Sequence, residues 1–447
     1  MTTQALKKLQ RREFLRRASA LGVMGTAAPW ALNLAAIGEA AAAASGAGDY
    51  KALVCVFLNG GNDYANTLVP YDDAGYKAYQ AIRPSIATAR DALAATALSP
   101  RVALPGGRQM ALAPQMGRFK TLFDAGKLGL LLNVGTLVQP TTVAQYKAQS
   151  VPLPPKLFSH NDQQSVWQSS SPEGATSGWG GRIGDLFLNG NGNATFTCVN
   201  VSGNAVFMSG QQAVQYQMAA CGAVAIRGVT QPLFGSQACA DALRSLITAE
   251  RSHWMEQELG RVTSRSINAQ ATVTSALASL PALATPFDSA NSLAMQLQMV
   301  AKMIGARAGL GVSRQIFFVS LGGFDLHDNL PTQHPLLLGN VASARASFHD
   351  ATAELGVADQ VTAFTASDFG RTLTSNGDGS DHGWGSHHFV LGGAVKGGRF
   401  WGQLPSVSIN GPDDVGQGRL LPTTSVDQMA ATLGAWFGAA DGALLDV

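Results

Sequence analysis

The chain has 447 residues, a formal net charge of +2, 46% hydrophobic residues and 13% charged residues. This length can bury a large core in one elaborated domain or two, and the charge balance lacks the basic excess typical of nucleic-acid binders, so we expect no nucleic-acid partner. Only four cysteines are present, which excludes a disulfide-held scaffold, although Cys221 and Cys239 are close enough in sequence to pair in an oxidising compartment.

The first residues predict an export signal. Residues Arg11–Arg16 have the sequence RREFLR, which is typical of a twin-arginine signal. A mildly apolar stretch from Ala18 to about Ile37 and an alanine run, Ala40–Ala44, follow it. A basic, an apolar and a small-residue region in this order form a secretory signal peptide, which we expect to be removed near residues 42–44. An amphipathic N-terminal helix is the alternative.

Removal of residues 1–44 leaves residues 45–447, which we expect to form a single α/β domain that is periplasmic or secreted. The removed segment carries six Lys/Arg and two Asp/Glu residues, so the mature chain has a charge of about −2. Gly22, Gly25, Pro29 and Asn33 make the segment a poor spanning helix, and we therefore expect no stable membrane anchor.

Alternating apolar runs and helical patterns predict the fold. Five short apolar runs are expected to be buried strands: Ala52–Leu58, Leu128–Val134, Gln315–Leu321, Val361–Thr365 and His388–Leu391. Helical patterns lie between them, at Ala240–Leu280, Ser292–Ala308 and Val341–Leu355. Strands that alternate with helices predict an α/β fold, a three-layer α/β/α sandwich around a mostly parallel sheet. The stretch around residues 194–310 is expected to be an insertion that begins with loops and hairpins.

Ligands of such sheets bind at the carboxyl ends of the strands, so the polar residues that follow each strand are the site candidates. After the first strand, Gly60 and Gly61 allow a tight turn that brings Asp63 to the rim of the sheet. There the carboxylate could hold a cation. Alternatively, Asp63 forms an Asx-type turn that only caps the next element.

A second candidate follows the proline-rich run Pro152–Pro155. Ser159 is expected to be the N-cap of a helix. Because backbone N–H groups at a helix N-terminus attract anions, a metal-activated Ser159 nucleophile is also conceivable. The neighbouring His160 could serve as a general acid or base.

Asp325 and His327 follow the predicted strand Gln315–Leu321 and a pair of glycines. A carboxylate oxygen and an imidazole nitrogen on one strand-end loop form a combination that zinc and related hydrolytic metals bind. The sequence therefore predicts metal ligands here, with an ordinary hydrogen-bonded loop as the alternative.

The predicted strand Val361–Thr365 leads to Asp368 and Arg371, and a glycine-rich loop with His382, His387 and His388 follows. Three of the eight histidines fall within seven residues, which favours a functional role. Arg371 could bind a tetrahedral anion through its planar guanidinium, or form a buried salt bridge with Asp368. His387 is a further general acid–base candidate.

Several segments together resemble the exported proteins of the family named domain of unknown function 1501. They are Phe57–Pro70 (FLNGGNDYANTLVP), Ser159–Gln168 (SHNDQQSVWQ), Ser177–Gly184 (SGWGGRIG), Gly322–His327 (GGFDLH), Asp368–Thr372 (DFGRT) and Asp381–His382 followed by Phe389–Gly398. These segments run in order through most of the mature chain. That family in turn resembles the alkaline-phosphatase and sulfatase superfamily, whose members hold divalent metals at strand ends and use a Ser, Thr or modified Cys nucleophile.

The resemblance implies an alkaline-phosphatase-like fold and a role for each matching residue. Asp63 would be the first-strand metal carboxylate and Ser159 the nucleophile. One metal site would consist of Asp325, His327 and His382, and Asp368 would belong to the other. The chain departs from the superfamily at Phe369, where a histidine often follows the late aspartate, and it lacks the Cys-x-Pro-x-Arg motif of formylglycine sulfatases.

These observations predict an exported, metal-assisted hydrolase of phosphate or sulfate esters that acts on a small anionic ester. Its expected cofactor is a divalent metal ion, zinc first, with calcium, magnesium or manganese as alternatives. One alternative is a non-catalytic binding or assembly protein on the same fold. Another is a metal-independent serine esterase, because Gly60–Asp63 is similar to the Gly-x-Asn-Asp block of SGNH-type esterases.

Overall fold

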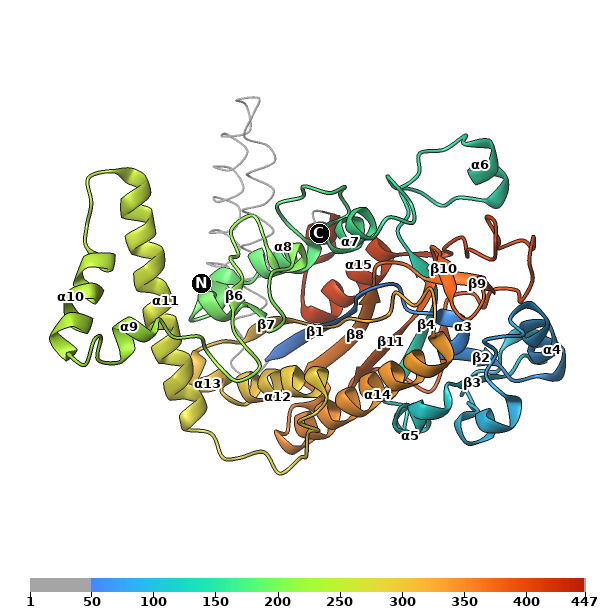
Figure 1. Ribbon diagram of the computed structural model, residues 1–447, viewed down its shortest axis with the longest axis horizontal. Helices are drawn as coiled ribbons and strands as arrows, with labels where there is room; N and C mark the ends of the chain where they lie inside the picture. The colour runs from blue at the N-terminus through green and yellow to red at the C-terminus, as the bar shows by residue number, and fades with distance from the viewer. Residues whose placement is uncertain (1–49, 446–447) are drawn as a thin grey trace, which may run out of the picture.

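The computed structural model describes residues 50–445, and the predicted signal over residues 1–44 lies outside them. Within this range nine strands form one sheet in the order β12-β4-β11-β8-β1-β7-β5-β6, with β13 beside β4 (Figure 1). The strands are β1 (Lys51–Leu58), β4 (Leu128–Gly135), β5 (Cys198–Asn200), β6 (Tyr216–Gln217), β7 (Arg314–Leu321), β8 (Val361–Ser367), β11 (Ser386–Gly392), β12 (Phe400–Trp401) and β13 (Thr424–Ser425).

The sheet is mostly parallel, as predicted. Strand β1 pairs in parallel with β7 on one side and with β8 on the other. Strand β11 runs antiparallel to both of its neighbours, β8 and β4. The five strands expected from the sequence are β1, β4, β7, β8 and β11, so all five are confirmed. Because β1, β7 and β8 are parallel, their carboxyl ends share one rim of the sheet.

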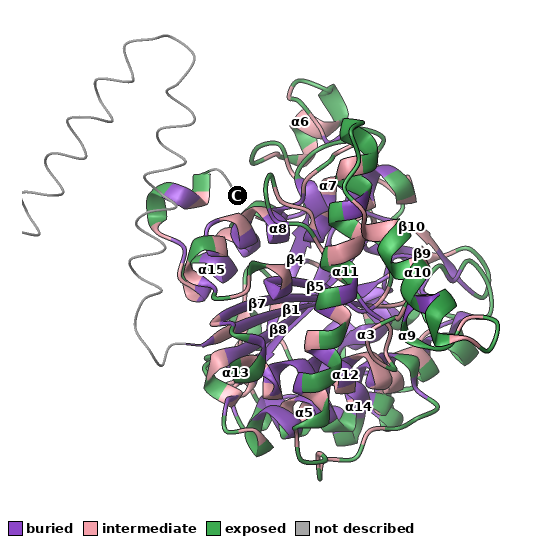
Figure 2. Ribbon diagram, turned by 90° about the vertical axis from the view of Figure 1, so that its left-hand side faces the viewer, coloured by how far each residue is buried: buried purple, intermediate pink, exposed green. Residues whose placement is uncertain are grey.

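Helices cover both faces, which confirms the three-layer arrangement (Figures 1 and 2). In β1, Ala52, Val54 and Val56 pack into one core cluster. Leu53 and Cys55 pack into the other, because successive strand residues point to opposite faces. The first core contains residues of α5 (Gly117–Asp124), α11 (Trp254–Ala278), α12 (Ser292–Gly305) and α14 (Leu330–Glu354). The second contains residues of α7 (His160–Ser169), α8 (Trp179–Asp185) and α15 (Val426–Phe437).

The predicted helices are present with different bounds. The helix expected over residues 240–280 is two helices, α10 (Gln237–Thr248) and α11, which extend away from the sheet in Figure 1. The helix expected over residues 341–355 is the second half of α14, which begins before Pro331 and Pro335. Short elements complete the chain: α3 (Tyr64–Thr67), β2 (Leu68–Pro70), α4 (Asp73–Ile82), β3 (Met110–Leu112), α6 (Val143–Ala148), α9 (Arg227–Thr230), α13 (Arg307–Leu310), β9 (Arg371–Ser375) and β10 (Ser380–His382).

Two further observations concern earlier expectations. All four cysteines lie among the described residues and are free thiols, so Cys221 and Cys239 are not bridged in this structure. Between residues 50 and 445, no helix combines the length and the apolar character needed to cross a membrane.

The loop after β1 is held by a buried ion pair. Gly60 and Gly61 have φ values of +114° and +83°, which glycine adopts without strain. Asp63 then caps α3, with its Oδ1 accepting from the backbone N–H of Asn66 at 2.9 Å. Its Oδ2 lies 2.6 Å from Nη2 of Arg83, and the two side chains are 1% and 0% exposed. Burial opposes the charge, but Arg83 outweighs it and holds the pKa of Asp63 at about 2.

Asp63→Asn should destabilise the fold by about 3–5 kcal/mol, because it leaves the buried Arg83 without its counter-charge. Equilibrium unfolding in urea measures this change. The matched control is Asp73→Asn, which removes the partner of Arg90 from a pair whose side chains are 75% and 42% exposed. That control should cost less than about 1 kcal/mol. Equal effects of the two variants would contradict the structural role of the buried pair.

Three histidines are buried in the interior as neutral rings. His387 and His388 lie on β11 with 3% and 1% exposure, and His334 lies on α14 with 1% exposure. Burial lowers the pKa of His334 and of His387 to about 4 and that of His388 to about 3. The unfolded chain therefore binds protons that the native protein excludes.

Stability should consequently fall as the pH drops from about 6.5 towards 4, because between these values only the unfolded state is protonated at these rings. His160, whose pKa is raised by its hydrogen bond to Asp368, contributes with the opposite sign but is a single group. Urea midpoints measured across this pH range test the expectation. His334→Gln should flatten the dependence, whereas His253→Gln, at an exposed histidine, should leave it unchanged. A flat profile for the wild type would count against buried neutral histidines.

Candidate metal centre

Four side chains from distant parts of the sequence meet at the rim formed by the carboxyl ends of β1, β7 and β8. His160 is the first residue of α7, Asp325 and His327 follow β7, and His382 ends β10. We call these four residues the His/Asp cluster. The predicted meeting of Asp325, His327 and His382 is therefore present, and His160, expected only as an acid or base, joins them.

Three donor atoms of the cluster, from His160, Asp325 and His382, are spaced as ligands of one ion would be. Nε2 of His382 lies 3.1 Å from Nε2 of His160 and 2.9 Å from Nε2 of His327. Oδ1 of Asp325 lies 3.0 Å from Nε2 of His327 and 3.3 Å from Nε2 of His382. Its Oδ2 lies 3.4 Å from Nε2 of His160. Tetrahedral ligands about 2.0–2.1 Å from a zinc ion are about 3.3 Å apart, so these distances fit.

The other ring nitrogen of two histidines is already hydrogen-bonded. Nδ1 of His160 lies 2.6 Å from Oδ2 of Asp368. Nδ1 of His382 donates to the carbonyl oxygen of Phe158 at 2.7 Å. A proton on each Nδ1 leaves the Nε2 lone pairs facing the centre, as in histidines that bind metals. Burial lowers the pKa of His382, which also favours its neutral form.

Asp368 supports His160 from behind. Besides the ring, it accepts hydrogen bonds from the backbone N–H of Gly60 at 3.2 Å and from Nε2 of Gln164 at 2.9 Å. The carboxylate is 1% exposed. Asp368 was expected to bind a second ion, but the structure places it as the carboxylate that orients a histidine of the cluster.

Arg371 orients the carboxylate of the cluster. Its Nη1 donates to Oδ1 of Asp325 at 2.7 Å and to the carbonyl oxygen of Gly60 at 3.1 Å. Its Nε donates to the carbonyl oxygen of Ser380 at 3.0 Å, and the side chain is 0% exposed. Burial raises the pKa of Asp325, but the hydrogen bond from Arg371 and the positive charge of Arg371 outweigh it and lower this pKa. Neither expectation for Arg371, an anion contact or a pair with Asp368, matches this placement, because the enclosed guanidinium faces Asp325.

Asp381 and Arg419 were not singled out from the sequence. Oδ1 of Asp381 lies 3.8 Å from Nδ1 of His327, and Asp381, His327 and His382 form a second group able to hold a metal. Arg419 donates from Nε to the carbonyl oxygen of His382 at 2.7 Å, and its guanidinium lies over the ring of Phe158. Asp381 could have been found as the neighbour of His382. Arg419 lies in a loop that shares no motif with the cluster.

Three predicted site residues have other surroundings. Ser159 occupies the N-cap position of α7, but its hydroxyl donates to Oδ2 of Asp162 at 2.9 Å instead of accepting from a backbone N–H. Asp63 is committed to Arg83 and to the hydroxyl of Ser380, so it does not join the cluster. His387, expected as an acid or base, is enclosed because it lies within β11.

His387 accepts from the backbone N–H of Asn133 at 3.1 Å and packs against the ring of Tyr64. At the cluster itself, Phe369, the departure noted in the sequence, lies against two imidazoles. Its ring centroid is 4.8 Å from that of His160 and 4.7 Å from that of His382. An apolar ring therefore replaces the polar residue that the superfamily resemblance implies.

Comparisons with known proteins identify a family. The sequence model of the family described as protein of unknown function DUF1501 matches residues 50–445. No curated protein matches the sequence. The structure is similar to the PsFucS1 sulfatase from Pseudoalteromonas sp., with 8% identity, a TM-score of 0.37, and coverage of 92% of this chain and 71% of that chain.

A second similar structure is a Bacteroides thetaiotaomicron protein from a core genetic locus for glycosaminoglycan metabolism. Here the identity is 11%, the TM-score is 0.32, and 88% of this chain and 74% of that chain are covered. Similarity at this level does not establish a shared substrate or mechanism.

The arrangement predicts how zinc binding responds to mutation. Asp368→Asn should weaken zinc binding by about 10–100-fold, because it removes the charge that orients His160. His382→Ala should weaken it further, since His382 belongs to both metal-binding groups. Zinc titrated into chelator-treated protein, followed by calorimetry, measures both effects, with the exposed His253→Ala as control. If Asp368→Asn binds zinc as tightly as the wild type, the proposed orientation of His160 is incorrect.

Proposed function

The chain belongs to the family of proteins of unknown function DUF1501, and we propose that it is an exported, metal-assisted hydrolase of phosphate or sulfate esters. The observation that carries the proposal is the His/Asp cluster, in which three Nε2 atoms and a carboxylate meet at a strand-end rim. Such a rim is where ligands of open α/β sheets bind.

The residues of the cluster fit a divalent metal. His160, Asp325 and His382 form one group able to hold an ion, and His327, 2.9 Å from His382, belongs to a second group with Asp381. Imidazole nitrogens with one carboxylate suit zinc better than calcium or magnesium, which prefer oxygen ligands. When bound, such an ion would supply the positive charge that stabilises negative charge developing on the ester.

The chain's own residues would position the ester. Asp325 is fixed by Arg371 and His160 by Asp368, so neither ligand has to reorient on binding. Because Arg371 is enclosed, we assign the contact with the substrate anion to Arg419, whose side chain is 20% exposed. Its Nη2 is only loosely paired, at 3.5 Å from Oδ2 of Asp381.

We assign the attack on the ester to water. The hydroxyl of Ser159 is hydrogen-bonded to Asp162 within the first turn of α7, which supports a structural role for this residue. With the ion held by His160, Asp325 and His382, we assign to His327, whose side chain is 43% exposed, the acceptance of the proton from the attacking water.

The test is hydrolysis of p-nitrophenyl phosphate and p-nitrophenyl sulfate by zinc-loaded protein. We expect turnover of at least one ester, its loss on treatment with a chelator, and its recovery with zinc. His382→Ala should reduce turnover to the level of the metal-free protein, because both metal-binding groups lose a ligand. His253→Ala should match the wild type.

Other outcomes would contradict the proposal in distinguishable ways. Turnover that resists chelation but disappears in Ser159→Ala would indicate a serine esterase. Stoichiometric zinc with no turnover of either ester would indicate a binding protein, a possibility that the apolar Phe369 beside the cluster favours.

A further inference from the structure

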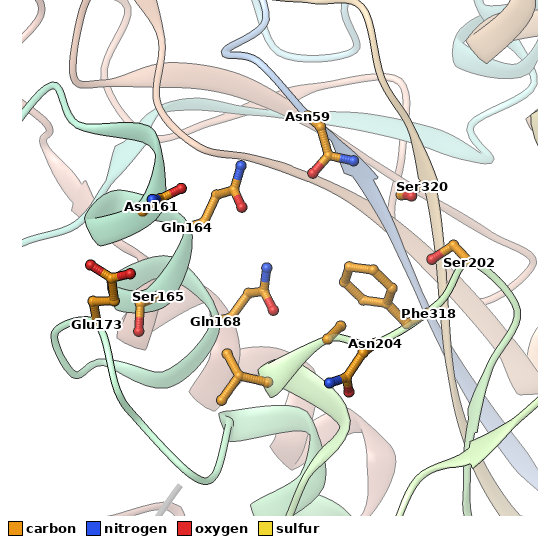
Figure 3. Close-up of a pocket in the computed structure, with 12 residues that line it drawn as sticks. Asn59, Asn161, Gln164, Ser165, Gln168, Glu173, Ser202, Asn204, Phe318 and Ser320 are labelled. Carbon is orange, nitrogen blue, oxygen red and sulfur yellow. The ribbon is translucent and has the colours of Figure 1, made fainter.

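Figure 3 shows a polar pocket of about 450 Å³. It adjoins the His/Asp cluster, because Gln164, which lines it, contacts the same carboxylate, Asp368, as His160. Asn59, directly after β1, and Ser320, near the end of β7, line it at the same rim. Pockets that bind small molecules commonly have volumes of about 300–1,000 Å³, so its size is suited to a ligand. No residue predicted from the sequence as part of a site lies among those that line it.

One face of α7 joins the pocket to the cluster. His160, Gln164 and Gln168 are spaced at i, i+4 and i+8, so they lie in a row along the helix. His160 belongs to the cluster, whereas both glutamines extend into the pocket (Figure 3). Gln164 and His160 also share Oδ2 of Asp368. One end of a molecule bound in the pocket would therefore lie next to the His/Asp cluster.

The pocket offers hydrogen-bonding groups that are held in place. Gln168 is 7% exposed, and its Oε1 accepts from the backbone N–H of Phe207 at 3.1 Å. This bond fixes the amide, and the described residues provide no partner for its Nε2, which points into the pocket (Figure 3). The side chains of Asn59 and Ser320 likewise make no hydrogen bond to another residue between 50 and 445.

The lining indicates which ligand chemistry fits. Amides and hydroxyls provide both donors and acceptors, and among the lining residues between 50 and 445 the only charged one is the exposed Glu173. Without a lining cation the pocket does not suit an anion, and one carboxylate does not make a metal site. The ring of Phe318 lies opposite the glutamines and offers an apolar surface (Figure 3). Donors and acceptors around one aromatic ring match an uncharged, hydroxyl-rich molecule.

We propose that this pocket binds an uncharged sugar residue, the part of the substrate that carries the ester to the His/Asp cluster. The role of the ester rests on the proposed function, whereas the binding of a neutral sugar does not. A sugar held along α7 would place its substituent at the end of the helix where His160 lies. The substrate class would then be a sugar phosphate or a sugar sulfate.

The test measures binding of a panel of neutral mono- and disaccharides, among them glucose, galactose and N-acetylglucosamine, to chelator-treated protein by NMR. We expect at least one sugar to bind. Gln168→Glu, which keeps the acceptor for Phe207 but replaces the free amide with a charge, should weaken binding by about tenfold or more. Asn204→Ala, at an exposed lining residue, should weaken it too, and provides a test if the buried variant is unstable. Gln139→Ala, at an exposed glutamine outside the pocket, is the matched control.

Two results would overturn the proposal: no binding of any sugar in the panel, or binding that both pocket variants leave unchanged. The protein in this experiment carries no metal and is given no ester. The outcome of the experiment therefore does not depend on whether the protein is a hydrolase. Sugar binding without ester turnover would refute the proposed function alone, and turnover of aryl esters without sugar binding would refute this inference alone.

Discussion

The contact on which the rim depends is the 2.6 Å hydrogen bond between Asp368 and His160. Asp368 belongs to the segment after β8, and His160 begins a helix that lies more than two hundred residues earlier in the chain. The same carboxylate binds the backbone of Gly60 after β1. One buried charge therefore ties α7 to two neighbouring strands, and the position of the helix determines both the cluster and the pocket. A buried carboxylate is costly in free energy unless it is hydrogen-bonded, and the contacts of Asp368 with Gly60, His160 and Gln164 offset that cost.

Two aspartate–arginine pairs lie near this rim, and the exposure of the aspartate determines whether it can also bind a metal ion. Asp63 and Arg83 are both enclosed, and they pair through Nη2 of Arg83 and Oδ2 of Asp63. Asp325 also has an enclosed arginine, Arg371, but its own side chain remains 45% exposed. Since Asp325 keeps an oxygen near His160 and His382, it can accept another cation, whereas Asp63 cannot without losing Arg83. An aspartate at a strand end therefore does not by itself indicate a metal ligand; its exposure and its ion-pair partner decide whether it can be one.

These pairs also show how far the sequence alone could lead. Apolar runs identified the five longest strands, and the family resemblance grouped Asp325, His327 and His382. The partner of Asp63 lies twenty residues further along, at the C-cap of α4, a helix whose orientation no local pattern reveals. The pairing of Arg371 with Asp325 instead of Asp368 depends on how β9 is placed against the loop that follows β7. His387 follows the same glycine-rich loop as His382, yet it lies inside β11, a strand whose residues are buried on both faces.

The pocket escaped the sequence analysis for a related reason. Amides and hydroxyls are common on surfaces, and nothing in their spacing marks Asn59, Ser320 and Asn204 as neighbours. The helical row His160, Gln164 and Gln168 was visible as a period of four, but a polar row on a helix normally faces water. Only the tertiary position of α7 turns that row towards the sheet. Because Gln164 and His160 both bond to Oδ2 of Asp368, displacement of either side chain would change the hydrogen bond of the other. A ligand held by these amides would thus be coupled to the geometry of the cluster through a single carboxylate.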